Sequence, residues 1–210
     1  MLNRHAVRAC LLFAGVTAGA CGSPTPAPAP PAAATTSPTA TGDTANAEVT
    51  GTAPRGAIVS LQPAAGETPL PEGPAVMDQY GKRFVPEMLY VRVGQPVEFR
   101  NTEDMGHNVT VNRRDTGAGI FSVETDPQQK HVHTFDRVGQ YDVTCSMHPG
   151  MLATVVATRS PVSTTVGDDG RFTLNGVPAG DYKLSVTFEG QTVDQAVTVK
   201  GPRTEVKVTR

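Results

Sequence analysis

The most informative part of the sequence is GQYDVTCSMHPGM, residues 139–151. Tyr141, Val143 and Cys145 alternate with the polar Asp142 and Thr144, which is the period of a β-strand with one buried face. The alternation therefore predicts a strand that ends near Cys145 and turns this thiol toward the interior. A short loop with a histidine and a methionine follows the strand directly.

Other segments of the chain show the same alternation. In residues 96–101 (PVEFRN) Val97 and Phe99 alternate with polar residues, and in residues 107–112 (HNVTVN) His107 shares a face with Val109 and Val111. Gly, Pro, Asn and Asp separate these short runs, and no stretch after residue 48 keeps a helical period over three turns. The fold class that we predict is all-β, and His107 and Cys145 are expected to point inward near the ends of their strands.

The three cysteines of the chain are Cys10, Cys21 and Cys145. Cys10 lies in a segment that has the parts of an export signal in the expected order, and Cys21 stands at the expected cleavage point. Cys145 is therefore expected to have no disulfide partner within the folded part. A lone cysteine is more often a small buried hydrophobe than a ligand. Here, however, four donors stand at close spacing in two segments: His107, Cys145, His148 and Met151.

Two imidazoles, a thiolate and a thioether are the ligand set of a blue-copper site, with three close ligands and a longer axial sulfur. Thiolate and thioether suit Cu(I), and imidazole suits both oxidation states of copper. Zinc would prefer a tetrahedral set without a thioether. The donor set therefore predicts one type 1 copper per chain.

With these motifs, residues 75–158 resemble the cupredoxins, the blue-copper proteins built as Greek-key β-sandwiches. The resemblance rests on GQPVEFRN (94–101), HNV (107–109), the strand that leads into Cys145, and the loop from Cys145 to Met151. The short gap between His148 and Met151 is similar to amicyanin more than to plastocyanin. The resemblance implies that His107, Cys145 and His148 bind copper in one plane with Met151 axial. It also implies that Asn108 bonds near Ser146 and ties the two ligand segments together, and that the backbone N–H of Asn108 points at the Cys145 sulfur.

A second block covers residues 160–210. The turn signal Asp168-Asp169-Gly170 comes before Phe172 and Leu174, which run into Asn175-Gly176, and strand alternation returns over residues 182–188. This pattern predicts a small antiparallel β-sandwich that resembles the carboxypeptidase regulatory-like modules of transthyretin-type fold. Because some fifty residues form a marginal core, we expect it to pack on its neighbour or to recruit strands from residues 49–74. In the second case the copper domain is an insertion.

The first 48 residues carry the signals for location. Arg4 and Arg8 precede the apolar stretch 9–20, which has the layout of a signal peptide and is too short to cross a bilayer as a helix. Cys21 follows Ala18-Gly19-Ala20 and resembles a lipoprotein box; the alternative is a soluble secreted protein with a free N-terminal Cys. Residues 21–48, rich in Ala, Pro and Thr, predict a disordered linker. The expected location is the periplasm or cell envelope, with membrane contact through lipidated Cys21.

The composition of the chain limits the classes of function that it can have. The formal charge of −2 and the lack of a basic run exclude nucleic acid as a partner. No catalytic constellation stands out, and beyond the ligands the folded part offers only His131 and His133, which either form a second surface metal site or are solvated strand residues. The expected function is a monomeric one-electron carrier, not an enzyme, whose redox partner docks near His148. Met105 and Met147 are candidates for an apolar docking rim.

Two alternatives stay open at this point. In the first, the protein binds, buffers or delivers copper without passing electrons. In the second, copper is structural only and the C-terminal module binds an envelope partner.

Overall fold

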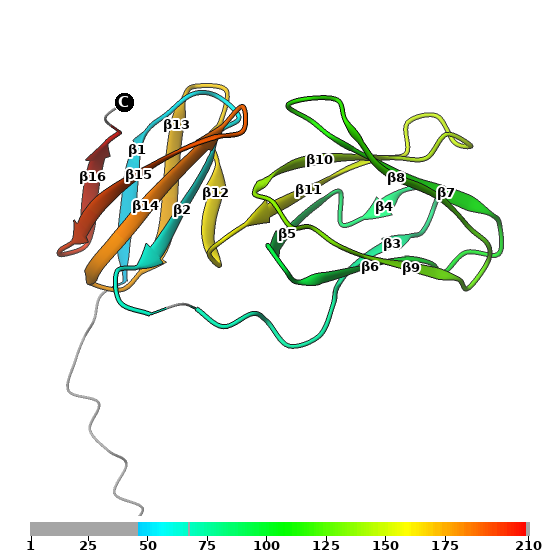
Figure 1. Ribbon diagram of the computed structural model, residues 1–210, viewed down its shortest axis with the longest axis horizontal. Helices are drawn as coiled ribbons and strands as arrows, with labels where there is room; N and C mark the ends of the chain where they lie inside the picture. The colour runs from blue at the N-terminus through cyan, green and yellow to red at the C-terminus, as the bar shows by residue number, and fades with distance from the viewer. Residues whose placement is uncertain (1–45, 67, 209–210) are drawn as a thin grey trace, which may run out of the picture. The chain divides into compact units, whose positions relative to one another are not determined.

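The structure, a computed structural model, describes residues 46–66 and 68–208, and all its regular elements are β-strands (Figure 1). The prediction of an all-β protein is thereby confirmed. The strands form two sandwiches, each around its own apolar core. No helix among the described residues is long and apolar enough to cross a membrane. The predicted signal peptide, Cys21 and most of the predicted linker lie outside the described residues.

The first sandwich consists of a four-stranded and a five-stranded sheet. The four-stranded sheet has the order β4-β3-β6-β9, and the five-stranded sheet has the order β5-β11-β10-β7-β8. Its strands are β3 (Ala75–Gln79), β4 (Phe84–Val85), β5 (Met88–Arg92), β6 (Pro96–Asn101), β7 (His107–Arg113), β8 (Gly119–Thr125), β9 (Lys130–Thr134), β10 (Gly139–Thr144) and β11 (Leu152–Thr158).

The alternation read from the sequence sets the inner faces of these sheets. Val97 and Phe99 of β6, and Tyr141 and Val143 of β10, are buried, whereas their polar neighbours are half-buried or exposed. The Tyr141 hydroxyl donates to the carbonyl of Arg137, four residues upstream, at 2.9 Å. This contact resembles the tyrosine corner of other β-sandwiches and fixes the entry into β10, the strand that leads to Cys145.

The second sandwich combines strands from both sides of the first one in the sequence. One sheet has the order β13-β1-β16 and the other β12-β2-β14-β15. The strands are β1 (Ala47–Thr52), β2 (Ile58–Pro63), β12 (Val162–Thr165), β13 (Arg171–Val177), β14 (Gly180–Phe188), β15 (Gln191–Val199) and β16 (Arg203–Lys207). Residues 75–158 are therefore inserted between β2 and β12 of this second sandwich.

Two details differ from the sequence expectations. The expected linker reaches residue 48, but β1 begins at Ala47, which is buried and lies opposite Val177. Asn175-Gly176, a turn signal in the sequence, lies inside β13, where the register between β1 and β13 shifts and Gly176 has φ of 72°. The left-handed glycine thus serves a β-bulge.

Gly51 of β1 marks a close approach in the second core. A Cβ at this position would lie 2.5 Å from Cζ of Phe172 and 2.6 Å from the carbonyl oxygen of Val206. Distances this short force neighbouring atoms to move, and one of these two atoms belongs to the backbone of β16. The position therefore requires the absence of a side chain.

Replacing Gly51 by Ala should lower the free energy of unfolding by about 1 to 3 kcal/mol, the usual cost of overpacking a core. Urea denaturation monitored by circular dichroism measures it. Gly119→Ala is the matched control, because a Cβ there meets only the Asn112 side chain at 3.6 Å. Equal stability of the two variants would contradict the close approach.

Candidate metal centre

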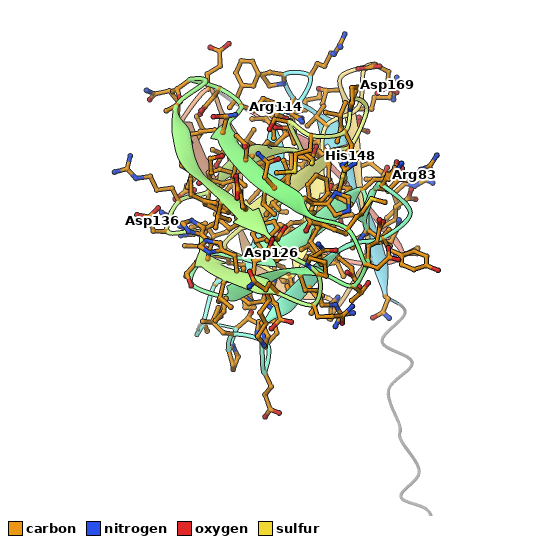
Figure 2. All side chains as sticks on the ribbon, turned by 90° about the vertical axis from the view of Figure 1, so that its right-hand side faces the viewer. Arg83, Arg114, Asp126, Asp136, His148 and Asp169 are labelled. Atoms are coloured by element: carbon orange, nitrogen blue, oxygen red, sulfur yellow. The ribbon has the colours of Figure 1, made fainter. Side chains whose placement is uncertain are left out.

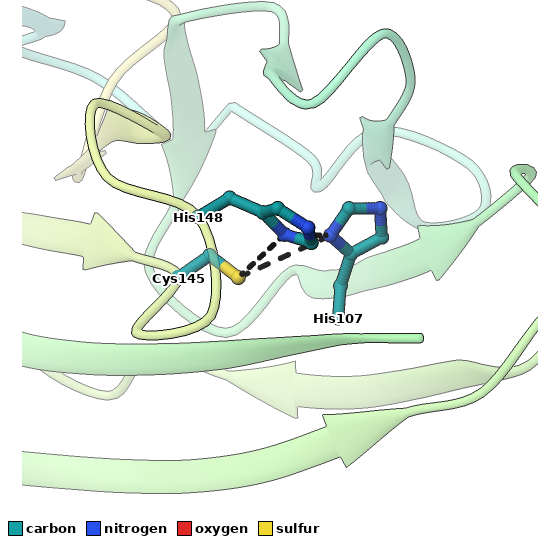
Figure 3. Close-up of side chains that lie close together, drawn as sticks. All are labelled: His107, Cys145 and His148. Carbon is teal, nitrogen blue, oxygen red and sulfur yellow. Dashed lines mark hydrogen bonds between the residues drawn. The ribbon is translucent and has the colours of Figure 1, made fainter. Parts of the chain in front are cut away.

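Three of the four predicted ligands converge at one end of the first sandwich (Figure 3). The Nδ1 atoms of His107 and His148 lie 3.0 Å apart, and the Cys145 sulfur lies 4.0 Å from the first and 3.8 Å from the second. In the part of the chain that the structure describes, this is the one group of three or more His, Cys, Asp or Glu side chains close enough to hold a metal ion.

Strand pairing explains why these residues meet. β7 and β10 are antiparallel neighbours with Thr110 opposite Thr144, so the first residue of β7, His107, and the residue just after β10, Cys145, lie at the same end. The following loop is tight: the amide of Met151 donates to the carbonyl of His148, and the amide of Cys145 donates to the carbonyl of Met151, both at 3.2 Å. These bonds turn His148 back toward His107.

The predicted role of Asn108 as a tie between the ligand segments is confirmed. Its Nδ2 donates to Oγ of Ser146 at 2.8 Å, and its Oδ1 accepts from the amide of Ser146 at 2.7 Å. Two hydrogen bonds between the residue after His107 and the residue after Cys145 hold both donors in one geometry. The predicted contact between the Asn108 amide and the Cys145 sulfur stays a prediction.

Met151, the predicted axial ligand, is 1% exposed and belongs to the same buried cluster as Cys145. Its backbone closes the ligand loop, as described above, and its side chain packs in the core rather than in solvent. The burial suits a weak thioether ligand. Its ligation stays a prediction.

Glu103 is a residue of the site that the sequence did not reveal. Oε2 of Glu103 lies 3.2 Å from Nε2 of His107, and Oε1 accepts from the amide of Lys82 at 2.7 Å. The Lys82 amide first, and the His107 side chain next, lower the pKa of Glu103 below its ordinary value although the carboxyl is partly buried. The carboxylate therefore accepts the Nε2–H of His107 and leaves Nδ1 free to bind a metal, a common arrangement at metal sites. The only sequence signal for this role of Glu103 is its position four residues before His107, and that signal is weak.

His131 and His133, the possible second metal site, are half-buried on β9 instead of solvated. Both rings pack on Phe121, with centroid distances of 4.7 and 4.8 Å. Burial, and then the charge of His131, lower the pKa of His133. Within the described ranges no third His, Cys, Asp or Glu ligand joins them in a metal-sized cluster.

Exposure differs sharply among the three converging ligands. His107 is 0% and Cys145 6% exposed, whereas His148 is half-buried and reaches the surface. Figure 2 labels His148 in a view of all described side chains. Two apolar residues close to His148 in the sequence are exposed: Met147 at 46% and Leu152 at 61%. Met105 is partly buried. A metal held here would be shielded from water on the side of His107 and Cys145.

The donor set fits copper. Two imidazole nitrogens and a thiol sulfur offer the mixture of borderline and soft donors that copper accepts in both oxidation states. The tie through Asn108 and the bond from Glu103 hold the two segments and the His107 ring without help from a metal. The site can therefore receive copper with little rearrangement.

Comparison with known proteins agrees with this chemistry. Residues 75–158 match the family model of copper binding proteins of the plastocyanin/azurin family, and all four predicted ligands fall inside this range. No curated protein matches the chain. The family match and the converging donors identify copper as the cofactor of this site.

Several solved structures are similar to part of the chain. They include the reduced Cu(I) form of one amicyanin mutant (28% identity, 48% of this chain and 98% of that chain covered, TM-score 0.38) and the oxidised state of another (29%, 49% and 98%, TM-score 0.38). A purple cupredoxin from Nitrosopumilus maritimus is 23% identical and covers 40% of this chain and 99% of itself, with a TM-score of 0.36. The likeness of residues 160–210 to transthyretin-type modules stays a prediction.

Replacing Cys145 by Ser should abolish the intense thiolate-to-copper absorption of the copper-loaded protein, because the band requires a sulfur bound to the metal. A visible absorption spectrum measures it. Thr144→Ser, one residue earlier, keeps the thiol and should keep the colour. A strongly coloured Cys145→Ser protein would contradict the assignment.

Replacing Glu103 by Leu should lower copper affinity by about 10- to 100-fold, the usual effect of losing a partner behind a ligating histidine. Glu103→Gln keeps an oxygen that can accept from His107 and should lose less. Competition with a chelator of known affinity measures both. Parental affinity in the Leu variant would show that Glu103 does not orient the ring.

Proposed function

We propose that the protein is a one-electron carrier of the bacterial cell envelope and not an enzyme. Copper bound by His107, Cys145 and His148, with Met151 as a fourth and weaker ligand, would supply a Cu(II)/Cu(I) couple. The observation that carries the proposal is the exposure pattern: of the three converging ligands, only His148 reaches the surface. Electrons would enter and leave along this side chain.

The residues around the site suit this role in two ways. Burial of His107 and Cys145 excludes water from most of the metal's surroundings. The bonds of Asn108 to Ser146 and of Glu103 to His107 resist movement of the donors. A site that keeps its geometry in both oxidation states loses little energy to reorganisation when an electron is transferred.

The surface around His148 supports the docking of a redox partner. Met147 and Leu152 expose apolar side chains beside the ligand in the sequence, and weak redox encounters need only a small contact area. We propose that the chain acts as a monomer.

The location at the envelope rests on the sequence of the first 48 residues. The signal-like segment 1–20, the lipoprotein-like Cys21 and the linker up to the start of β1 suit a folded body tethered to a membrane. Such a tether would raise the concentration of the carrier near membrane-bound partners.

A second candidate function is copper delivery. Met147 exposes its thioether next to His148, and Met105, two residues before His107, is partly buried. Thioethers are soft donors that suit Cu(I). They would favour transfer of the ion itself to another protein.

One experiment separates the two functions. The copper-loaded full-length protein is examined by voltammetry and then reduced and mixed with a Cu(I) chelator of modest affinity. The carrier predicts a reversible wave and retention of the metal, because two of the ligands are buried. An irreversible wave with rapid loss of Cu(I) would contradict the carrier and favour delivery.

A further inference from the structure

A set of buried polar side chains lies behind His107, where four strand ends meet. Gln79 ends β3, Asn101 ends β6, Thr125 ends β8, and His107 begins β7. Gln79 is 0% exposed, and Asn101 and Thr125 are 1% exposed. They belong to a sandwich whose apolar core is formed by Val, Phe, Tyr, Met, Ala and Cys side chains. We call Gln79, Asn101 and Thr125 the polar clasp.

Gln79 bridges the two sheets of the sandwich. Its Oε1 accepts from the hydroxyl of Thr125 at 2.6 Å, and its Nε2 donates to the carbonyl of Asn108 at 3.2 Å. Gln79 belongs to the four-stranded sheet, whereas Asn108 and Thr125 belong to the five-stranded sheet. One amide therefore fixes the backbone of the residue that follows His107.

Asn101 holds the loop on the other side of His107. Its Nδ2 donates to the carbonyls of Met105 and Thr125 at 2.7 and 2.9 Å. Its Oδ1 accepts from the amide of Glu103 at 3.0 Å. The loop that carries Glu103, the partner of the His107 ring, is thus fastened to the end of β6.

Strand register places the clasp directly beneath the ligand. Gln79 and Asn101 are opposite each other in the pairing of β3 with β6, and Thr125 is opposite His107 in the pairing of β7 with β8. The clasp therefore contacts the backbone before His107, after it and opposite it.

The burial of two amides at this point has a physical reason. Residues 102–106 form no regular secondary structure. Their backbone groups and the carbonyls at the strand ends need hydrogen-bond partners that β-sheet pairing does not supply. A buried carbonyl without a partner is costly, so apolar side chains could not replace the amides without loss. The same bonds also limit the positions that His107 can take.

We propose that Gln79, Asn101 and Thr125 are positioning residues that hold the Nδ1 of His107 at ligand distance in the metal-free protein. The clasp contacts no ligand side chain and acts through the backbone around His107 and through Glu103. The inference rests on copper binding at the site but not on the electron-carrier role, so it survives if the protein delivers copper.

The test compares Gln79→Met with Gln95→Met. Gln95 is also buried, at 7% exposure, and its Oε1 accepts from the amide of Arg92 at 3.1 Å in the turn between β5 and β6. Both variants replace a buried glutamine by methionine, which has a similar size, and both should lower thermal stability. Only the first removes a bond to the residue after His107.

Two measurements are made on full-length protein. Cu(II) affinity from chelator competition should fall about 10- to 100-fold for Gln79→Met and stay at the parental value for Gln95→Met. In the metal-free protein, the ¹⁵N NMR signal of the His107 Nε2–H should shift or broaden only in Gln79→Met. Parental affinity and an unchanged signal in Gln79→Met would overturn the proposal, as would equal losses of affinity in both variants.

Thr125→Val and Thr125→Ser provide a milder pair if Gln79→Met does not fold. Valine removes the hydroxyl that donates to Gln79, and serine keeps it. The proposal predicts that Cu(II) affinity falls for valine and returns for serine. Equal affinity of these two variants would overturn it.

Discussion

The metal centre requires two imidazole nitrogens and a thiol, which come from two separate segments, to stay within a few ångströms of one another. Bringing these polar side chains together removes them from water, which costs free energy unless other contacts compensate for it. Here the pairing of β7 with β10 brings the segments together, and the Asn108–Ser146 bonds lock them. Glu103 orients the His107 ring, and we propose that the polar clasp fixes its backbone. The rest of the first sandwich serves to hold this arrangement.

Burial then determines what the site can do. His107 and Cys145 are shielded, and His148 faces outward beside the exposed Met147. A buried and fastened donor set suits exchange of an electron more than exchange of the ion, because release of copper requires ligands to leave one another. The second sandwich, assembled from strands on both sides of the insertion, fixes both ends of residues 75–158 in one fold.

Much of this arrangement could be predicted from the sequence, because the relevant signals are local. A period of two residues shows which side chains of β6, β7 and β10 point inward, and Cys145, His148 and Met151 lie within seven residues of one another. Glu103, Gln79 and Asn101 could not be found in this way. Gln79 bonds to Asn108 and Thr125, which lie in strands distant in the sequence. Glu103 and Asn101 have nearby partners, but the irregular loop between them and His107 has no period that points to these contacts. The alternation along β9 places His131 and His133 on its inner face. Their packing on Phe121 could not be predicted, because it requires knowing that β8 lies opposite β9 in the other sheet.

X-ray absorption spectroscopy of the copper-loaded parental protein can show whether two imidazoles and one thiolate hold the copper. We expect one short copper–sulfur bond and two nitrogen ligands with imidazole scattering, with nearly the same distances in the Cu(II) and Cu(I) forms. A first shell of nitrogen and oxygen alone would contradict it.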